Sequence, residues 1–175
     1  KRNNKFANSG IVVEIDAERD LRKYEKFGAL KGLEYQKDLE KIAFFAGGRT
    51  QTAPAQRLVD FAEGKLSTNL NDCSYQPGLK SAPLHSLLPK NIGSRLRKGF
   101  DTFGKKMHGY YTNEANIVGV ESRTSSPVNI PRKEDLEHPQ IKGLFPCGEG
   151  GGYAGGIVSA AMDGERCAEA AISKI

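Results

Sequence analysis

A glycine-rich turn near the end of the chain lies between an apolar run and a segment of small residues. The run Gly143-Leu-Phe-Pro-Cys-Gly-Glu149 leads into Gly150-Gly-Gly-Tyr-Ala-Gly-Gly156, and the small-residue segment extends from Ile157 to Ile175. This order predicts a strand, a tight turn and a helix. The first N–H groups of such a helix lack partners within it, and the helix dipole makes that end positive. The pattern is typical of a turn that holds a phosphate or an electron-rich ring.

Composition indicates a globular chain without membrane spans. The chain has 175 residues, 38% of them hydrophobic, which is enough for one domain or two small ones. No apolar run approaches the roughly 20 residues that cross a bilayer, and the polar N-terminus does not resemble a secretion signal. The three cysteines, Cys73, Cys147 and Cys167, are widely spaced. They predict neither a disulfide framework nor a metal site, and we expect a cytoplasmic protein.

Upstream of the turn, short strands and amphipathic helices are expected, which makes the fold class α+β. Runs of β-branched residues predict strands at 10–15 and 116–121. Apolar residues at spacings of three and four predict helices, and a proline at a helix start supports one of them. The expected helices cover residues 32–46, 53–64, 84–88 and 92–107, and residues 67–83 are expected to form a connection.

Gly150, Gly152 and Gly155 satisfy the spacing GxGxxG. A first dinucleotide-binding unit also needs a second parallel strand after the helix, with an acidic residue about twenty positions on to hold a ribose. The sequence stops at Ile175, where the predicted helix would finish. We therefore expect the turn to close a nucleotide-binding fold rather than to open one. A glycine turn with a purely structural role is the alternative.

The segment from Gly143 to Gly164 resembles the C-terminal, flavin-contacting segment of FAD-dependent oxidoreductases, in particular a bacterial group called FAD-dependent dehydrogenases. The resemblance continues upstream in Glu121-Ser-Arg-Thr-Ser-Ser-Pro-Val128, in Ala53-Pro-Ala-Gln-Arg57 and in Asn8-Ser-Gly-Ile-Val-Val13. It implies a partial substrate or cap domain over residues 1–134. Residues 135–175 would then be the last strand, turn and helix of a Rossmann-like FAD-binding domain, in a protein that transfers hydride through flavin N5.

The resemblance also implies roles for residues of the turn. Glu149 would hydrogen-bond the ribitol or pyrophosphate end of FAD, although many members of the wider superfamily have Asp there. Backbone groups of Gly155, Gly156 and Ile157 would face the pyrimidine edge of the flavin, where negative charge develops on reduction. Two alternatives stay open: Glu149 stabilises the following helix, and Tyr153 either stacks near the flavin or covers the turn. The expected cofactor-binding set is Gly148, Glu149, Gly150, Tyr153, Gly155, Gly156 and Ile157.

A candidate substrate site follows the predicted strand 116–121. Arg123, Thr124, Ser125 and Ser126 offer one cation and three hydroxyls, a set that suits an anionic substrate or the flavin edge. A plain turn with a surface arginine is the alternative. No catalytic acid or base can be named, and the isolated residues His85, His108 and His138 predict no metal site.

The expected partner is the missing N-terminal half of an FAD site. The resemblance calls for a second GxGxxG that cradles the pyrophosphate, and these 175 residues do not contain it. We expect FAD to be held by the full-length protein and this chain alone to be inactive. Two other hypotheses remain open. In one, a basic helix at 90–108 docks nucleic acid or another anionic partner, although a solvated face is favoured there; in the other, the chain is a stand-alone nucleotide-binding domain.

Overall fold

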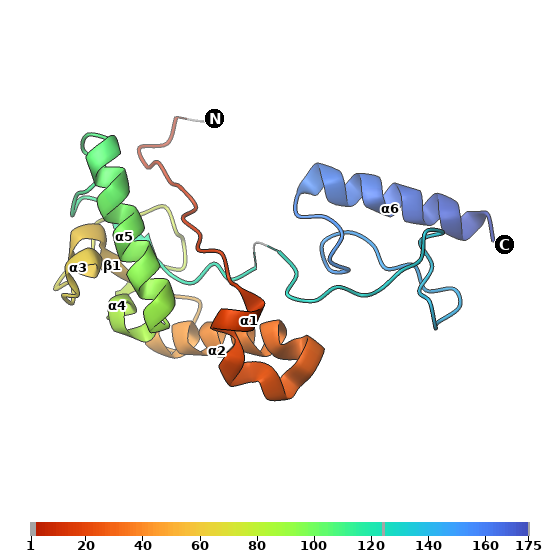
Figure 1. Cartoon of the computed structure of the whole chain (residues 1–175). Coiled ribbons are helices and arrows are strands. Elements are labelled where there is room, and N and C mark those ends of the chain that lie inside the picture. Colours follow the sequence, from red (N-terminus) through yellow and green to blue (C-terminus); the bar gives the residue numbers. More distant parts are fainter. Residues whose placement is uncertain (1–2, 124, 175) are drawn as a thin grey trace. The chain divides into compact units, whose positions relative to one another are not determined.

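A computed structural model describes residues 3–123 and 125–174, which form an α+β chain with a small three-stranded sheet. This confirms the expected fold class. The chain forms two compact units, each built from two stretches of sequence. The first unit comprises Lys1–Asp20 and Lys37–Val120, and the second comprises Leu21–Gln36 and Glu121–Ile175. Figure 1 shows the elements of both units along the chain.

The first unit is built on a sheet with strand order β2-β1-β3. The central strand β1 (Ala53–Arg57) pairs in parallel with β2 (Leu79–Ser81) and antiparallel with β3 (Asn116–Val118). Helix α3 (Leu58–Glu63) follows β1 directly and ends at Gly64, whose φ of 73° is the left-handed conformation common at helix ends. Helix α1 (Ala17–Asp20) is a single turn in the N-terminal stretch of this unit.

An apolar core holds the first unit together. Leu58 and Phe61 of α3, Leu84 of α4 (Leu84–Leu87) and Phe100 of α5 (Lys90–Lys106) form one buried cluster. The rings of Phe61 and Phe100 meet edge to face, with centroids 5.9 Å apart, an arrangement that adds to the stabilisation from burial alone.

The second unit has one long helix and much irregular backbone. Helix α6 (Ile157–Ile172) follows a segment, residues 121–156, without helix or strand in its described part. A 3-10 segment, η1 (Arg22–Leu30), and the first residues of α2 (Lys31–Ala46) complete the unit. The start of α2 lies against the irregular segment, since a side chain at Gly32 would approach Pro127 to 3.0 Å. Gln36 also donates a hydrogen bond to the carbonyl of Ser122 at 2.7 Å.

The helices expected from apolar spacing are present as α2, α4 and α5, and the strand expected at 116–121 is present as the shorter β3. The helix expected at 53–64 is wrong in its first half, because Ala53–Arg57 forms the central strand and only Leu58–Glu63 is helical. Pairing on both edges outweighs the local preference for a helix start at Pro54. The expected connection 67–83 contains β2.

Two expected strands do not form in the described chain. Residues 10–15 have no regular secondary structure, and neither do Leu144–Cys147, in the apolar run before the glycine turn. A strand needs a neighbouring strand to satisfy its backbone N–H and C=O groups. The sheet of the described residues consists of β1, β2 and β3 alone, and none of its pairs involves either run.

Candidate functional site

The glycine turn is a closed loop of backbone hydrogen bonds. The N–H of Tyr153 donates to the carbonyl of Gly148 at 3.0 Å, and the N–H of Gly152 donates to the carbonyl of Glu149 at 3.0 Å. Gly148 and Gly152 have φ values of 64° and 84°, which favour glycine. At Gly152 a side chain is also excluded by space, because its Cβ would lie 2.6 Å from the carbonyl oxygen of Val128. Both the backbone conformation and the lack of space therefore require glycine at position 152.

The start of α6 follows the turn and is open. Gly156 is the N-cap residue, with no side-chain cap among the described residues, and helical bonding begins where the N–H of Ala160 donates to the Gly156 carbonyl at 2.8 Å. A side chain at Gly155 would meet nothing within 4 Å in the described chain. Ile157 is 92% exposed. The unpaired N–H groups of the first helical turn therefore follow two residues without side chains, Gly155 and Gly156.

A buried ion pair connects the turn to α6. Asp163, on α6, accepts hydrogen bonds from both terminal nitrogens of Arg132, at 2.9 and 2.8 Å, and from the N–H of Gly148 at 2.9 Å. The side chains of Arg132 and Asp163 are only 10% and 8% exposed. The hydrogen bonds from Arg132, followed by that from Gly148, hold the pKa of Asp163 at about 2, below its usual 3.8.

Arg132 also contacts the chain before and after Gly148. Its Nη1 donates to the carbonyl of Pro146 at 2.9 Å and lies 3.4 Å from the Sγ of Cys167. Its guanidinium carbon lies 3.6 Å from the centre of the Tyr153 ring, a cation–π contact. The Tyr153 hydroxyl donates to the carbonyl of Ile130 at 2.7 Å. The ring of Tyr153 is thus held over Arg132.

A second ionic cluster lies at the other end of α6. Lys174 donates to Asp135 and to Glu137, both at 2.7 Å, and the N–H of Gly143 donates to Glu137 at 2.8 Å. Lys174 holds the pKa of Asp135 at about 2, and the Gly143 N–H together with Lys174 does the same for Glu137. This cluster ties the loop before the apolar run to the end of α6.

Of the other predicted cofactor residues, Glu149 and Gly150 are exposed at the turn. Of the predicted substrate residues, Ser126 lies beside Gly150. Ser126 donates to the carbonyl of Val128 at 2.7 Å and lies 3.5 Å from the carbonyl of Gly150. Ser125 is exposed, and the backbone N–H of Arg123 donates to the Glu121 carboxylate at 3.3 Å. Thr124 lies outside the described residues.

Sequence reasoning missed Arg132 and Asp163. Asp163 carries a weak signal, because it is an acid in a run of small and apolar residues and lies four positions before Cys167, so both share a helix face. Both are buried, and burial raises the pKa of the Cys167 thiol. No pattern marks Arg132, whose partners lie 14 and 31 positions away in the chain.

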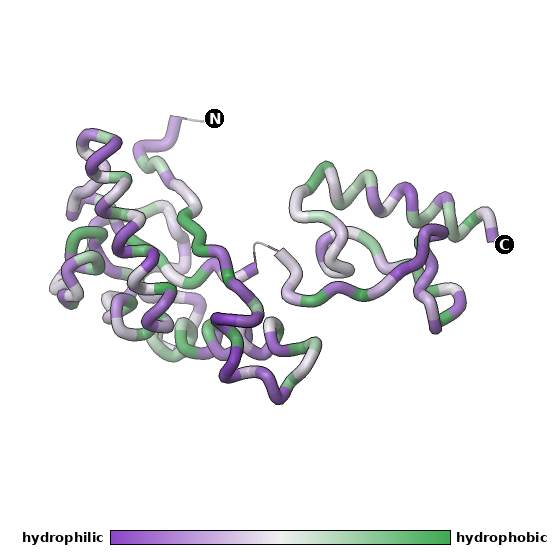
Figure 2. The backbone as a smooth tube through the Cα atoms, in the orientation of Figure 1, coloured by the Kyte–Doolittle hydropathy of each residue, from purple (hydrophilic) through white to green (hydrophobic). Residues whose placement is uncertain are grey.

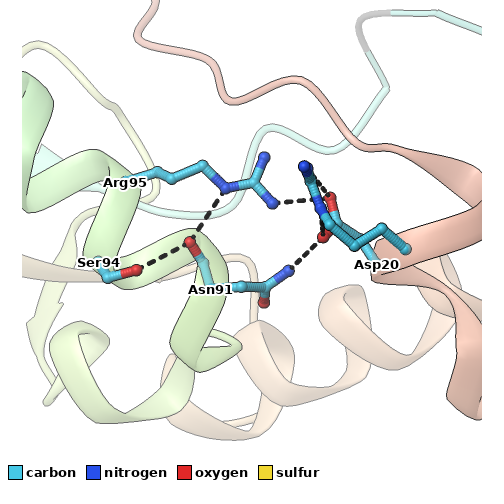
Figure 3. Close-up of a pocket in the computed structure, with 5 residues that line it drawn as sticks. Asp20, Asn91, Ser94 and Arg95 are labelled. Atoms are coloured by element: carbon cyan, nitrogen blue, oxygen red, sulfur yellow. Dashed lines mark hydrogen bonds and ion pairs between the residues drawn. The ribbon is translucent and has the colours of Figure 1, made fainter.

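The basic residues of α5 are partly engaged within the first unit. Arg95 pairs with Asp20 at 2.7 Å and donates to the carbonyl of Glu14 at 2.6 Å, and Lys105 pairs with Asp101 at 2.7 Å. Figure 3 shows Arg95 and Asn91 pointing toward Asp20, around a surface pocket. Hydrogen bonds from Arg19 and then Arg95 hold the pKa of Asp20 below its usual range. These contacts pin the N-terminal stretch of the unit to α5.

The described residues show neither a metal-binding cluster nor a membrane-spanning helix. They hold no group of three or more His, Cys, Asp or Glu side chains arranged to bind a metal ion. Among the same residues, no helix has the length and apolar character that crossing a bilayer requires.

Comparison with known proteins identifies a family and a relative. The sequence model of the family described as "FAD-dependent protein, C-terminal domain-like" matches residues 1–124. A protein of Clostridium beijerinckii, described as uncharacterized, is 39% identical over 170 residues, which cover 96% of this chain and 31% of that protein. This chain therefore spans about a third of the length of that relative. The second match includes most of the glycine turn and α6, which lie beyond the family match.

Proposed function

The chain belongs to the family of FAD-dependent protein, C-terminal domain-like sequences, and from this we propose that it supplies the flavin-facing turn of an FAD-dependent oxidoreductase. The observation that carries the proposal is the open start of α6 directly after the glycine turn. Gly155 and Gly156 are exposed, and no side chain of the described residues caps the helix. A helix end of this kind stabilises negative charge.

The residues at the turn fit the edge of a flavin ring. A planar group can approach the backbone closely at Gly155, where the described chain leaves open space. The N–H groups of the first turn of α6 would donate to the electron-rich edge, and Glu149 would bind the ribitol or pyrophosphate end. When bound, the flavin would supply a hydride acceptor and donor at N5. The chain's part is to orient the ring and to favour the charge that reduction adds.

The remaining roles extend this proposal. Residues 135–175 would be the last segment of a Rossmann-like FAD-binding domain, in which the apolar run 143–149 gains strand partners from the rest of a longer protein. Residues 1–134 would belong to a substrate or cap domain, although the compact units divide at Val120. Arg123, Ser125 and Ser126, with Thr124, would contact an anionic substrate. A cytoplasmic location accords with three free cysteines in the described chain.

Flavin content of a longer protein that contains this chain tests the proposal. We expect the purified protein to be yellow and Gly155→Val to raise its dissociation constant for FAD by about tenfold or more, the equivalent of about 1.4 kcal/mol. Gly10→Val is the matched control, because Gly10 also faces open space without a positive φ. FAD affinity should be unchanged in the control. A colourless protein that cannot be reconstituted with FAD contradicts the proposed function.

A further inference from the structure

We infer that Arg132 and Asp163 are positioning residues, which fix the glycine turn against α6. They thereby set the affinity for FAD and the reduction potential of the bound flavin. The inference rests on the proposed function. It concerns two side chains whose contacts include Gly148, Pro146, Tyr153 and Cys167.

The ion pair holds the turn at three points. Asp163 accepts a hydrogen bond from the N–H of Gly148, and Arg132 donates one to the carbonyl of Pro146, two residues earlier. Arg132 also lies against the ring of Tyr153, five residues after Gly148. One pair of side chains therefore fixes the chain before, at and after the start of the turn. Because Asp163 belongs to α6, the same contacts fix the helix to which the turn leads.

The chemistry of each group suits this role. The hydrogen bond between the Gly148 N–H and Asp163 is buried, so its loss would leave a buried donor unpaired. A guanidinium binds a carboxylate through two parallel hydrogen bonds and keeps further donors and a flat face for other partners. Lysine cannot make this combination, because its ammonium is a point charge. Asparagine at position 163 carries no charge and has one acceptor oxygen, so its NH2 group would face one of the donors and it could not hold both the guanidinium and the Gly148 N–H.

The link to flavin binding follows from position in the chain. Only residues 149–156 separate Gly148 from the first residue of α6, so the two ends of the turn are fixed by Gly148 and by the helix. If Gly148 is released, the turn can move while α6 remains helical. The N–H groups near Gly155 would then no longer be preorganised for the flavin edge, and preorganisation is what makes such donors effective.

The test uses the longer, FAD-loaded protein with Asp163→Asn and Arg132→Lys. Both variants should weaken FAD binding by about tenfold or more. They should also shift the flavin reduction potential to more negative values, because the reduced, negatively charged flavin loses more stabilisation from the N–H groups of α6 than the oxidised flavin does. In the chain itself, amide exchange at Gly148 should become faster while the far-UV circular dichroism of the helices is unchanged. The potential and the exchange rate are readouts that loss of overall stability alone would not move together.

The matched control is Lys174→Gln. Lys174 also joins α6 to a loop of the same unit through two carboxylates, but its partners are Asp135 and Glu137 and not the turn. FAD affinity and flavin potential should be unchanged in this variant. If they change as much as in Asp163→Asn, the ion pair has no special role in positioning the turn, and the inference is wrong.

The outcomes separate the inference from the function on which it rests. A wild-type longer protein that takes up no FAD overturns the proposed function. A wild-type protein that binds FAD, together with variants of Arg132 and Asp163 that bind it equally well and at the same potential, overturns only the inference. If Asp163→Asn unfolds the chain, the milder Arg132→Lys variant decides the question by the same measurements.

Discussion

Different interactions stabilise the interior of each of the two compact units. The first has an apolar core in which Phe61 is fully buried and Phe100 nearly so, beneath a small sheet. The described part of the second relies on the buried pair of Arg132 and Asp163 and on carboxylates paired with Lys174. An apolar core tolerates changes in pH and charge, whereas a polar network depends on each partner. The candidate flavin-facing turn lies in the unit that is sensitive to single polar changes.

Helix α6 begins with apolar residues, green in Figure 2, although no side chain of the described residues caps this end of the helix. Ile157 and Val158 are 92% and 72% exposed, and the inward face of the helix carries Asp163 and Cys167 instead. The inside of the second unit is thus partly polar and its outside partly apolar, so hydrophobic burial contributes less to its stability than to that of the first unit.

The largest effect should come from the apolar core of the first unit. Phe61→Ala removes a ring with no exposed surface and should lower the free energy of unfolding by about 3–5 kcal/mol. Denaturant unfolding followed by circular dichroism measures the change. Phe44→Ala is the control, because this ring is 49% exposed and its removal should cost far less. Similar losses in both variants would show that the cluster around Phe61 is not the core.

A smaller effect should come from the glycine turn of the second unit. Gly152→Ala forces a side chain into a position 2.6 Å from the Val128 carbonyl, on a residue with a φ of 84°, and should cost about 1–3 kcal/mol. Gly150→Ala is the control, since a side chain there meets nothing within 4 Å among the described residues. Amide exchange of residues 147–153 reports both. Equal protection in the two variants would contradict the described turn.

The smallest effect should be a pH dependence confined to the second unit. The folded pKa of Asp163, about 2, lies below its usual 3.8, so this group stabilises the folded unit above about pH 4 and loses that contribution as the pH falls toward 2. Asp163→Asn should reduce the pH dependence. It should not abolish it, because Asp135 and Glu137 have lowered pKa values as well. Amide exchange at Gly148 between pH 5 and 2 measures the change. An unaltered pH profile in the variant would show that Arg132 and Gly148 do not lower the pKa of Asp163.

Much of the first unit could be predicted from the sequence, because its helices bury one face. The apolar spacing in α5 records that burial, since Ile92 and Phe100 are buried, and this helix lies close to its expected range. Helix α2 also lies close to its expected range, although Tyr35 is its only buried residue in the described chain. The strand β1 could not be predicted, since its partners, β2 and β3, lie far along the chain from it. Local preference at Pro54 favoured a helix, and the sheet outweighed it.

The candidate site was predicted only in outline. The glycines and small residues indicated a turn and a helix, and α6 is present from Ile157. The contacts that fix the turn involve Arg132 and Asp163, 31 positions apart. A single polar pair at that separation has no periodicity, so a lone sequence cannot reveal it. The expected strand at 143–149 depends in the same way on partners that the sequence does not identify.

The interleaving of the two units along the chain has a consequence for synthesis on the ribosome. Domains fold largely as units while the chain emerges from its N-terminal end. Residues 21–36 are made early, but the rest of their unit begins at Glu121, after all of Lys37–Val120. The first unit can therefore complete its sheet and core while residues 21–36 still await their partners. The ion pair of Arg132 and Asp163, and with it the glycine turn, is among the last features of the chain to form.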